Sequence, residues 1–154
     1  MASRAYQESI VINASPEAVY SLVTDIGRTG EWSPICKSCW WHDGGSARVG
    51  AQFTGRNELN GRTWDTVSTV IAADPGKEFA WSVSEDFVRW GYRISARDGG
   101  SELTEFWEFR PAGLQRFHNK YGDEAPVRIE ARTEQARRGI PATLAAIKRI
   151  IENE

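Results

Sequence analysis

The strongest constraint on the fold is a series of six β-rich segments between residues 38 and 110, each of strand length and separated by turn signals. The separators include Gly-Gly at 44–45, Asn-Gly at 60–61, Asp-Pro-Gly at 74–76 and Asp-Gly-Gly at 98–100. Asn-Gly joins paired strands in a tight hairpin, because both residues tolerate a positive φ. Six consecutive strands connected in this way predict one antiparallel sheet.

A further strand and two short helices are predicted before this series. Apolar and polar residues alternate over 5–13, which is typical of a strand. Ser15, Pro16 and Glu17 then form a helix start, with a capping hydroxyl, a proline suited to the first helical position and an acid that favours the helix dipole. One more short helix fits before Pro34, since the residue before a proline disfavours the α region.

The C-terminal segment changes to a helical period. Its pattern predicts a helix that begins near Asp123, with Pro126 in the first turn and a bend at Pro141. The chain therefore reads as one α+β domain over residues 1–154, in which a seven-stranded curved antiparallel sheet wraps around a long C-terminal helix. The residues of the helical stripe are Ile129, Thr133, Ala136, Ile140, Leu144, Ile147 and Ile151.

One helix covers the concave face of such a sheet but hardly fills it, so we expect a cavity between them. The chain has seven Trp, six Phe and four Tyr, more large rings than packing alone requires. Strand alternation turns many rings toward the cavity; the alternative is that they form plain core. We expect Trp32 at the cavity mouth. The candidate ligand-binding residues are Trp32, Asn57, Trp64, Trp81, Trp90, Tyr92 and Trp107, with Ile140 and Leu144 from the helix.

Glu105 is the candidate catalytic residue. It lies between Leu103 and Trp107 on a face predicted to point inward, where burial would raise the pKa of a carboxyl group. It could act as a general base or accept a ligand hydrogen bond. Alternatively it forms a structural pair with an arginine or a Trp N–H, or its strand faces the other way. His42 and His118 are possible acid–base residues without visible partners.

Cys36, Cys39 and His42 have the spacing C-x₂-C-x₂-H, which suggests either a zinc site or a redox pair. Zinc needs four ligands, or three and a water, and the chain adds only the distant His118. In an extended segment, residues three apart point to opposite faces, so the thiols would share neither a metal nor a disulfide. Strand-like residues follow, not the helix start that activates a redox thiol. We therefore expect a packing role and no metal site.

Charge and composition exclude several partners. The formal net charge is -2 and no basic cluster stands apart from acidic neighbours, so we expect no nucleic acid to bind. No apolar run approaches the length of a membrane span and the N-terminus lacks an apolar signal segment, so neither membrane insertion nor export is expected. Two cysteines favour a cytoplasmic protein with reduced thiols. No cofactor-binding motif occurs, so no cofactor is expected, and no feature fixes the oligomeric state.

Four segments together carry a resemblance to a known family. They are INASPEAVYSLVTDIGRTGEWSP, VGAQFTGRNELNGRTWDTVSTVIAADPGKEFAW, GGSELTEFWEF and GIPATLAAIKRIIE. Their order is similar to that of the START-like, helix-grip superfamily (SRPBCC), in its polyketide cyclase/dehydrase and lipid-transport branch of actinobacterial type. The resemblance covers nearly the whole chain and implies a helix-grip fold with a pocket for an apolar or aromatic small molecule. It implies no catalytic set, and residues 112–124 match least.

Two function classes follow from these features. The first is a protein that carries or senses an apolar, aromatic or lipid-like small molecule. The second is a polyketide cyclase or dehydratase that uses acid–base chemistry in the same cavity. The first is favoured, because no set of residues demands a reaction. A protein that only contacts other proteins is a third class.

Overall fold

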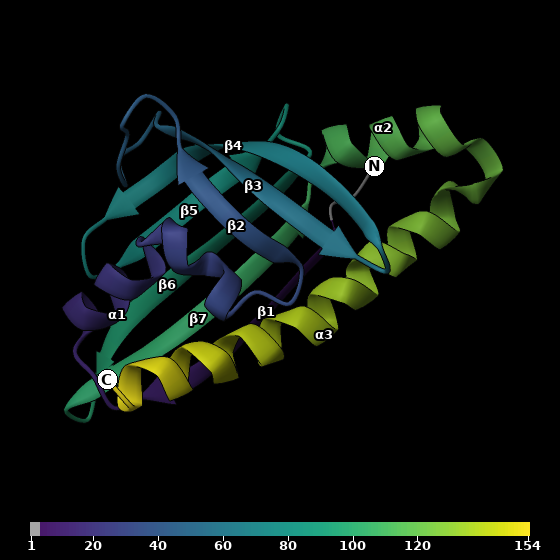
Figure 1. The fold of residues 1–154 in the computed structure, drawn as a ribbon. Coiled ribbons are helices and arrows are strands. Elements are labelled where there is room, and N and C mark those ends of the chain that lie inside the picture. Colours follow the sequence, from purple (N-terminus) through teal and green to yellow (C-terminus); the bar gives the residue numbers. More distant parts are fainter. Residues whose placement is uncertain (1–3) are drawn as a thin grey trace.

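In a computed structural model, which describes residues 4–154, one seven-stranded antiparallel sheet curves around a long helix (Figure 1). The strand order is β1-β7-β6-β5-β4-β3-β2, so the first and second strands form the two edges. The strands are β1 (Arg4–Ile12), β2 (Cys36–Trp41), β3 (Gln52–Leu59), β4 (Arg62–Asp74), β5 (Glu78–Val83), β6 (Val88–Arg97) and β7 (Gly100–Phe109). The helices are α1 (Pro16–Val23), α2 (Pro111–Tyr121) and α3 (Ala125–Glu152), with the short 3₁₀ segments η1 (Ile26–Glu31) and η2 (Gly122–Glu124).

The predicted helix-grip α+β fold is confirmed, with seven strands and two short helical segments after the first strand. The turn chemistry explains much of this agreement. Asn60 and Gly61 both have positive φ, 53° and 78°, as a two-residue hairpin between β3 and β4 requires. Ser15 caps α1 by accepting a hydrogen bond from the Ala18 N–H, and Pro16 occupies its first turn.

Helix α2 was not predicted from the sequence. Pro111 starts it, and Leu114 and Phe117 direct its apolar side inward. The Phe117 ring lies 5.0 Å from Phe109 at the end of β7 and 5.2 Å from Tyr121. The predicted start of the last helix at Asp123 is two residues early, because Gly122 and its neighbours form η2 before α3 begins.

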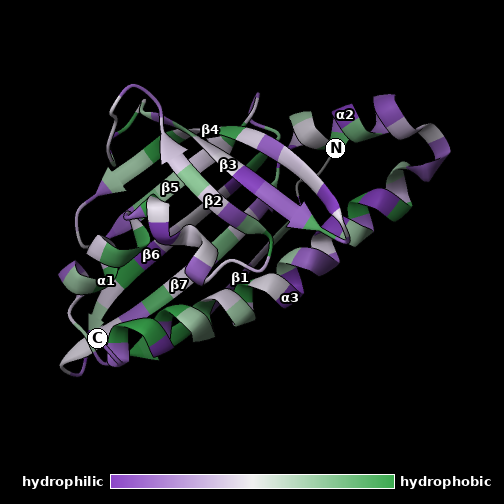
Figure 2. Ribbon diagram, in the orientation of Figure 1, coloured by the Kyte–Doolittle hydropathy of each residue, from purple (hydrophilic) through white to green (hydrophobic). Residues whose placement is uncertain are grey.

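Helix α3 lies along β1 and β7 (Figure 1). Its apolar residues are concentrated in the C-terminal half, whereas the half near α2 is more polar (Figure 2). Ile140, Leu144 and Ile147 are at most 2% exposed and belong to the main core. Pro141 lies within the helix, which continues to Glu152; the bend expected there stays a prediction.

Candidate functional site

A cavity of about 360 Å³ lies between the concave face of the sheet, η1, α2 and α3. Its size suits a small organic molecule. The predicted inward faces of the five strands from β3 to β7 do line it, which confirms the alternation argument. Val88 of β6 also lines the cavity and was not predicted. The predicted residues that line it are Phe53, Gly55, Asn57, Trp64, Thr66, Ser68, Phe79, Trp81, Val83, Trp90, Tyr92, Glu105, Trp107 and Phe109.

The aromatic wall follows from strand register. Trp81 pairs with Trp90 and Trp90 pairs with Trp107, so three indoles stand in one row across β5, β6 and β7. Trp90 and Trp107 have ring centroids 6.4 Å apart, and Trp81 lies 5.8 Å from Phe53. Rings at these separations stabilise one another and offer flat faces to a ligand.

Two predicted wall residues, Ile140 and Leu144, do not line the cavity. They pack into the core of the sheet, and the helix presents a neighbouring face, Arg132, Gln135, Gly139 and Thr143, to the cavity instead. The prediction was wrong because an apolar stripe marks the side of a helix that packs against other residues. The side of α3 that borders the cavity makes few such contacts, and its residues are mostly polar.

Trp32 lines the cavity as predicted but does not stand at its mouth. It is 4% exposed and lies beside Tyr92. Phe79, Glu105 and Thr143 are equally buried. We call these five residues the inner end of the cavity. Opposite to it is the α2 end, lined by the less buried Trp64, Arg116, Phe117, Arg132 and Gln135.

Glu105 is a buried carboxyl group at the inner end. It is 5% exposed, and its Oε1 atom has no hydrogen-bond partner among the residues the structure describes. Burial raises the pKa of Glu105 well above its usual range, because an ionised carboxylate loses its hydration there. A structural role for Glu105 would require an arginine or an indole N–H as its hydrogen-bond partner. No such partner of Oε1 is found among residues 4–154. The inward orientation of Glu105 that the sequence suggested is correct.

Tyr92 is the cross-strand neighbour of Glu105. Burial raises the pKa of the Tyr92 phenol, and the negative charge of Glu105 adds to this shift. The inner end therefore favours the neutral forms of both groups. Two neutral groups that donate and accept hydrogen bonds can bind a ligand hydroxyl or carbonyl group.

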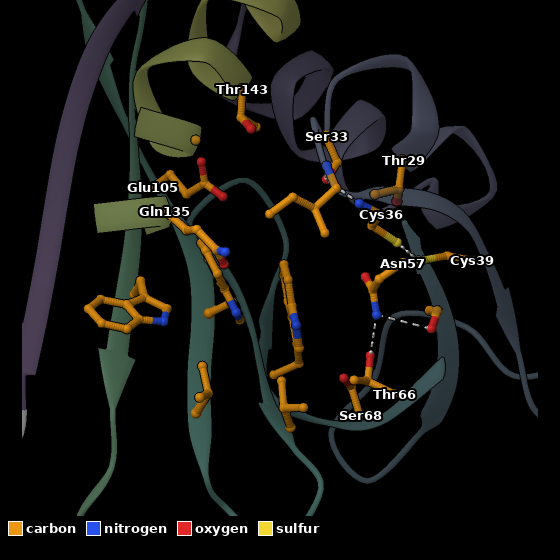
Figure 3. A pocket seen from close by; sticks show the side chains of 18 of the residues that line it. Thr29, Ser33, Cys36, Cys39, Asn57, Thr66, Ser68, Glu105, Gln135 and Thr143 are labelled. Atoms are coloured by element: carbon orange, nitrogen blue, oxygen red, sulfur yellow. Dashed lines mark hydrogen bonds between the residues drawn. The ribbon is translucent and has the colours of Figure 1, made fainter. Parts of the chain in front are cut away.

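Across the cavity from Glu105 lies a second polar wall, which contains Asn57, Thr66 and the two cysteines (Figure 3). The Asn57 amide donates to the Thr66 hydroxyl over 3.3 Å and to the Trp64 carbonyl over 3.4 Å. These bonds fix the amide at the cavity surface.

The prediction that Cys36 and Cys39 point to opposite faces was wrong. A β-bulge interrupts β2 between Cys36 and Ser38, so both thiols lie on the cavity side, with their sulfur atoms 3.2 Å apart. Gly55 lies beneath them, and a Cβ atom there would be 3.3 Å from Cys36 Sγ and 3.5 Å from Cys39 Sγ. Strict period-2 alternation fails because the bulge adds one residue to the strand.

The two thiols differ in acidity. The hydrogen bond with Cys39, together with burial, raises the pKa of Cys36, whereas the same hydrogen bond lowers the pKa of Cys39. The neighbouring Thr29 side chain also lowers the pKa of Cys39, whereas burial opposes this shift. Cys39 is therefore the more nucleophilic of the pair near neutral pH.

Other candidate groups lie elsewhere. His42 Nε2 is 2.7 Å from the Thr54 hydroxyl, and neither His42 nor His118 is among the residues that line the cavity. Within residues 4–154 no three His, Cys, Asp or Glu side chains are grouped as a metal site would require. None of the helices in the same residues has the length and apolar character needed to cross a membrane.

Sequence reasoning missed the polar residues that α3 and η1 bring to the cavity, notably Thr29, Arg132, Gln135 and Thr143. Arg132, Gln135, Gly139 and Thr143 recur at steps of three and four, so their common helix face was present in the sequence. The sequence did not indicate that this polar face of the helix borders the cavity, and that the apolar face beside it does not.

Comparison with known proteins gives a family and several structural neighbours. The family model for polyketide cyclase / dehydrase and lipid transport matches residues 3–143. No curated protein sequence matches the chain. The solution structure of the Polyketide_cyc-like protein Cgl2372 from Corynebacterium glutamicum is 49% identical, with a TM-score of 0.75 over 98% of this chain and 93% of that one.

Two more distant structures have the same fold. Ara h 8.0201 is 17% identical with a TM-score of 0.68 over 99% of this chain and 100% of its own. The di-domain ARO/CYC protein StfQ from the steffimycin biosynthetic pathway is 12% identical with a TM-score of 0.71, over 98% of this chain and 51% of that one. The match to the family model over most of the chain, together with Cgl2372, shows that the chain belongs to the polyketide cyclase / dehydrase and lipid transport family.

Proposed function

We propose that the protein binds an apolar small molecule, ring-containing or lipid-like, in this cavity and acts as its carrier or sensor. The observation that carries the proposal is the buried Glu105 Oε1 without a partner in residues 4–154, inside a cavity whose walls are rich in aromatic rings. An unsatisfied buried polar atom costs about 1–3 kcal/mol. A ligand hydroxyl or carbonyl group would remove that cost and orient the ligand.

The rest of the cavity supports the same proposal. The rings of Trp81, Trp90 and Trp107 offer stacking worth about 0.5–1.5 kcal/mol for each aromatic pair. Asn57 supplies a fixed amide on the opposite wall. The family description includes lipid transport, which requires such a cavity.

Intrinsic tryptophan fluorescence, titrated with flat polyphenols, fatty acids and sterols, tests the proposal. We expect quenching at micromolar ligand that weakens at least several-fold in Trp81→Ala. Trp40→Ala is the matched control, because Trp40 is 41% exposed and is not among the cavity residues. The proposal fails if no compound class changes the fluorescence, or if both variants weaken the response equally.

A second candidate is a cyclase or dehydratase that acts on a polyketide-like substrate. The observation in its favour is the neighbouring pair of Glu105 and Tyr92, two buried acids with raised pKa values. A protonated carboxyl group can supply a proton to a leaving hydroxyl group. Glu105→Gln separates the two candidates: a carrier would lose only modest affinity, whereas an enzyme would lose about 10²–10⁴-fold in turnover while it still bound its substrate.

A further inference from the structure

Arginines without acidic partners gather at the α2 end of the cavity and in a hollow that adjoins it. Arg132 lines both the cavity and a shallower hollow that continues from it toward the β3–β4 hairpin. Arg62 and Arg128 line the same hollow. None of the three forms a salt bridge with any residue in 4–154, although ten other basic residues of that range do. Glu124 is the one carboxylate among the described residues of the hollow.

The arginines are held by aromatic rings. The guanidinium carbons of Arg62 and Arg132 lie 5.0 Å and 6.0 Å from the centroid of the Trp64 ring. Arg132 is also 5.8 Å from the centroid of Phe117, and Arg128 is 4.3 Å from that of Tyr121. A guanidinium that stacks on a ring keeps its N–H edge free, and that edge is the part that binds carboxylate or phosphate oxygens in pairs.

Arg132 is the least exposed of these arginines, and burial lowers its pKa with no acid beside it to compensate. A half-buried cation without a counter-ion is unfavourable in the free protein. An anion that entered the hollow would relieve this cost. Three arginines face one carboxylate, Glu124, so the local charge remains positive.

On the basis of the proposed ligand-binding function, we propose that the ligand is an amphipathic anion. Its apolar body occupies the aromatic cavity, and its carboxylate or phosphate head group is bound at the α2 end by Arg132 and Arg62. The opposite, inner end supplies Glu105 and Tyr92 for an uncharged polar group.

Two distances within the fold set the length of such a ligand. Arg132 precedes Thr143 by eleven residues of α3, or about 16 Å along the helix axis. Glu105 precedes Phe109, the ring that contacts Phe117, by four residues of β7, or about 13 Å. A fatty acyl chain of about twelve carbons, or a fused ring system with a short acidic chain, spans a similar length.

The test is displacement of the neutral fluorescent probe N-phenyl-1-naphthylamine from the full chain by dodecanoate, dodecyl phosphate and methyl dodecanoate, each below its micelle concentration. We expect at least one of the two anions to displace the probe at roughly ten-fold lower concentration than the ester, since hydrogen bonds between charged groups are stronger than those to a neutral ester. The anion that displaces the probe better identifies the head group.

The variants Arg132→Met and Arg62→Met should each bind the anion about ten-fold more weakly than the unmodified protein. Their affinity for the ester should stay within two-fold of that of the unmodified protein. Arg132→Lys should restore part of the loss. Arg138→Met is the matched control on the same helix, because Arg138 is 80% exposed, pairs with Glu134 and lies outside the cavity. It should change neither affinity.

The outcomes separate the inference from the proposed function. If the probe and all three lipids fail to bind the unmodified protein, the proposed function itself fails. If the ester and the anions bind equally and the arginine variants do not change either affinity, the inference of an anionic ligand is overturned. The proposed binding of an apolar molecule in the cavity is then still supported. If Arg132→Met weakens binding to phosphatidylserine vesicles while the anion-to-ester ratio stays at one, the arginines face a membrane surface and the inference is overturned.

Discussion

The two ends of the cavity differ in solvent exposure and in charge. The inner end is sealed, with Trp32, Phe79 and Glu105 at most 5% exposed, and its one carboxyl group favours the neutral form. The α2 end is open, and its cations are held against aromatic rings. Burial at the inner end therefore contributes to stability, whereas solvent access at the α2 end leaves side chains available to bind a ligand.

The largest expected effect is the contrast between two tryptophans. Trp107→Ala should lower the free energy of unfolding by about 3–5 kcal/mol, because Trp107 is 3% exposed in the middle of the aromatic wall. Trp64→Ala should cost about 1 kcal/mol or less, since its ring is only partly buried and changes away from the core usually have small effects. Urea unfolding of both variants measures this; equal losses would show that the aromatic wall and the α2 end contribute alike to stability.

Glu105 should make stability depend on pH. Below the unfolded-state pKa of about 4.3, both states hold the proton and no penalty arises. As the pH rises, the unfolded state loses its proton first, so the folded state loses stability until the pH reaches the raised pKa of Glu105.

Glu105→Gln should therefore match the unmodified protein near pH 4 and exceed its stability by about 1 kcal/mol or more at pH 8, since one pKa unit corresponds to about 1.4 kcal/mol. Thermal unfolding at the two pH values measures the difference. Glu108→Gln is a control on the same strand, at a half-buried position outside the cavity. A Glu105→Gln variant that is less stable at pH 8 than at pH 4, relative to the unmodified protein, would contradict the neutral inner end.

A smaller effect is expected for the two thiols of the polar wall, which differ in reactivity. Cys39 should react with iodoacetamide several-fold faster than Cys36 at pH 7, because the Cys36 hydrogen bond favours the Cys39 thiolate. Cys36→Ala should slow the reaction of Cys39 by removing that donor. Peptide mass spectrometry follows both sites; equal rates in the unmodified protein would count against the hydrogen-bonded pair.

The smallest expected effect is on stability at the α2 end. Arg132→Met should leave the free energy of unfolding within about 0.5 kcal/mol or raise it, because a desolvated cation without an acidic partner is replaced by an apolar chain of similar length. Chemical denaturation compares it with Arg138→Met. A loss above about 2 kcal/mol would show that Arg132 is a structural residue.

The sheet and the covering helix could be predicted from the order of residues alone. Alternation over β3 to β7 assigned most of the inward side chains there, since a strand has only two faces and one of them was clearly apolar. It also identified Glu105 as an inward acid, because a charged residue in an apolar row stands out. Asn60-Gly61 fixed a hairpin, since few other pairs accept its two positive φ values.

Which groups meet in the cavity depends on contacts between elements that are distant in the chain. The bulge in β2 depends on pairing with β3, and it alone brings Cys36 beside Cys39. The rotation of α3 depends on how Ile140 and Leu144 pack against the sheet, and it turns Arg132 and Thr143 toward the cavity. A periodic pattern records the contacts that a residue makes with the core. A cavity is a place where such contacts are missing, so its lining is set by how separate elements pack around it.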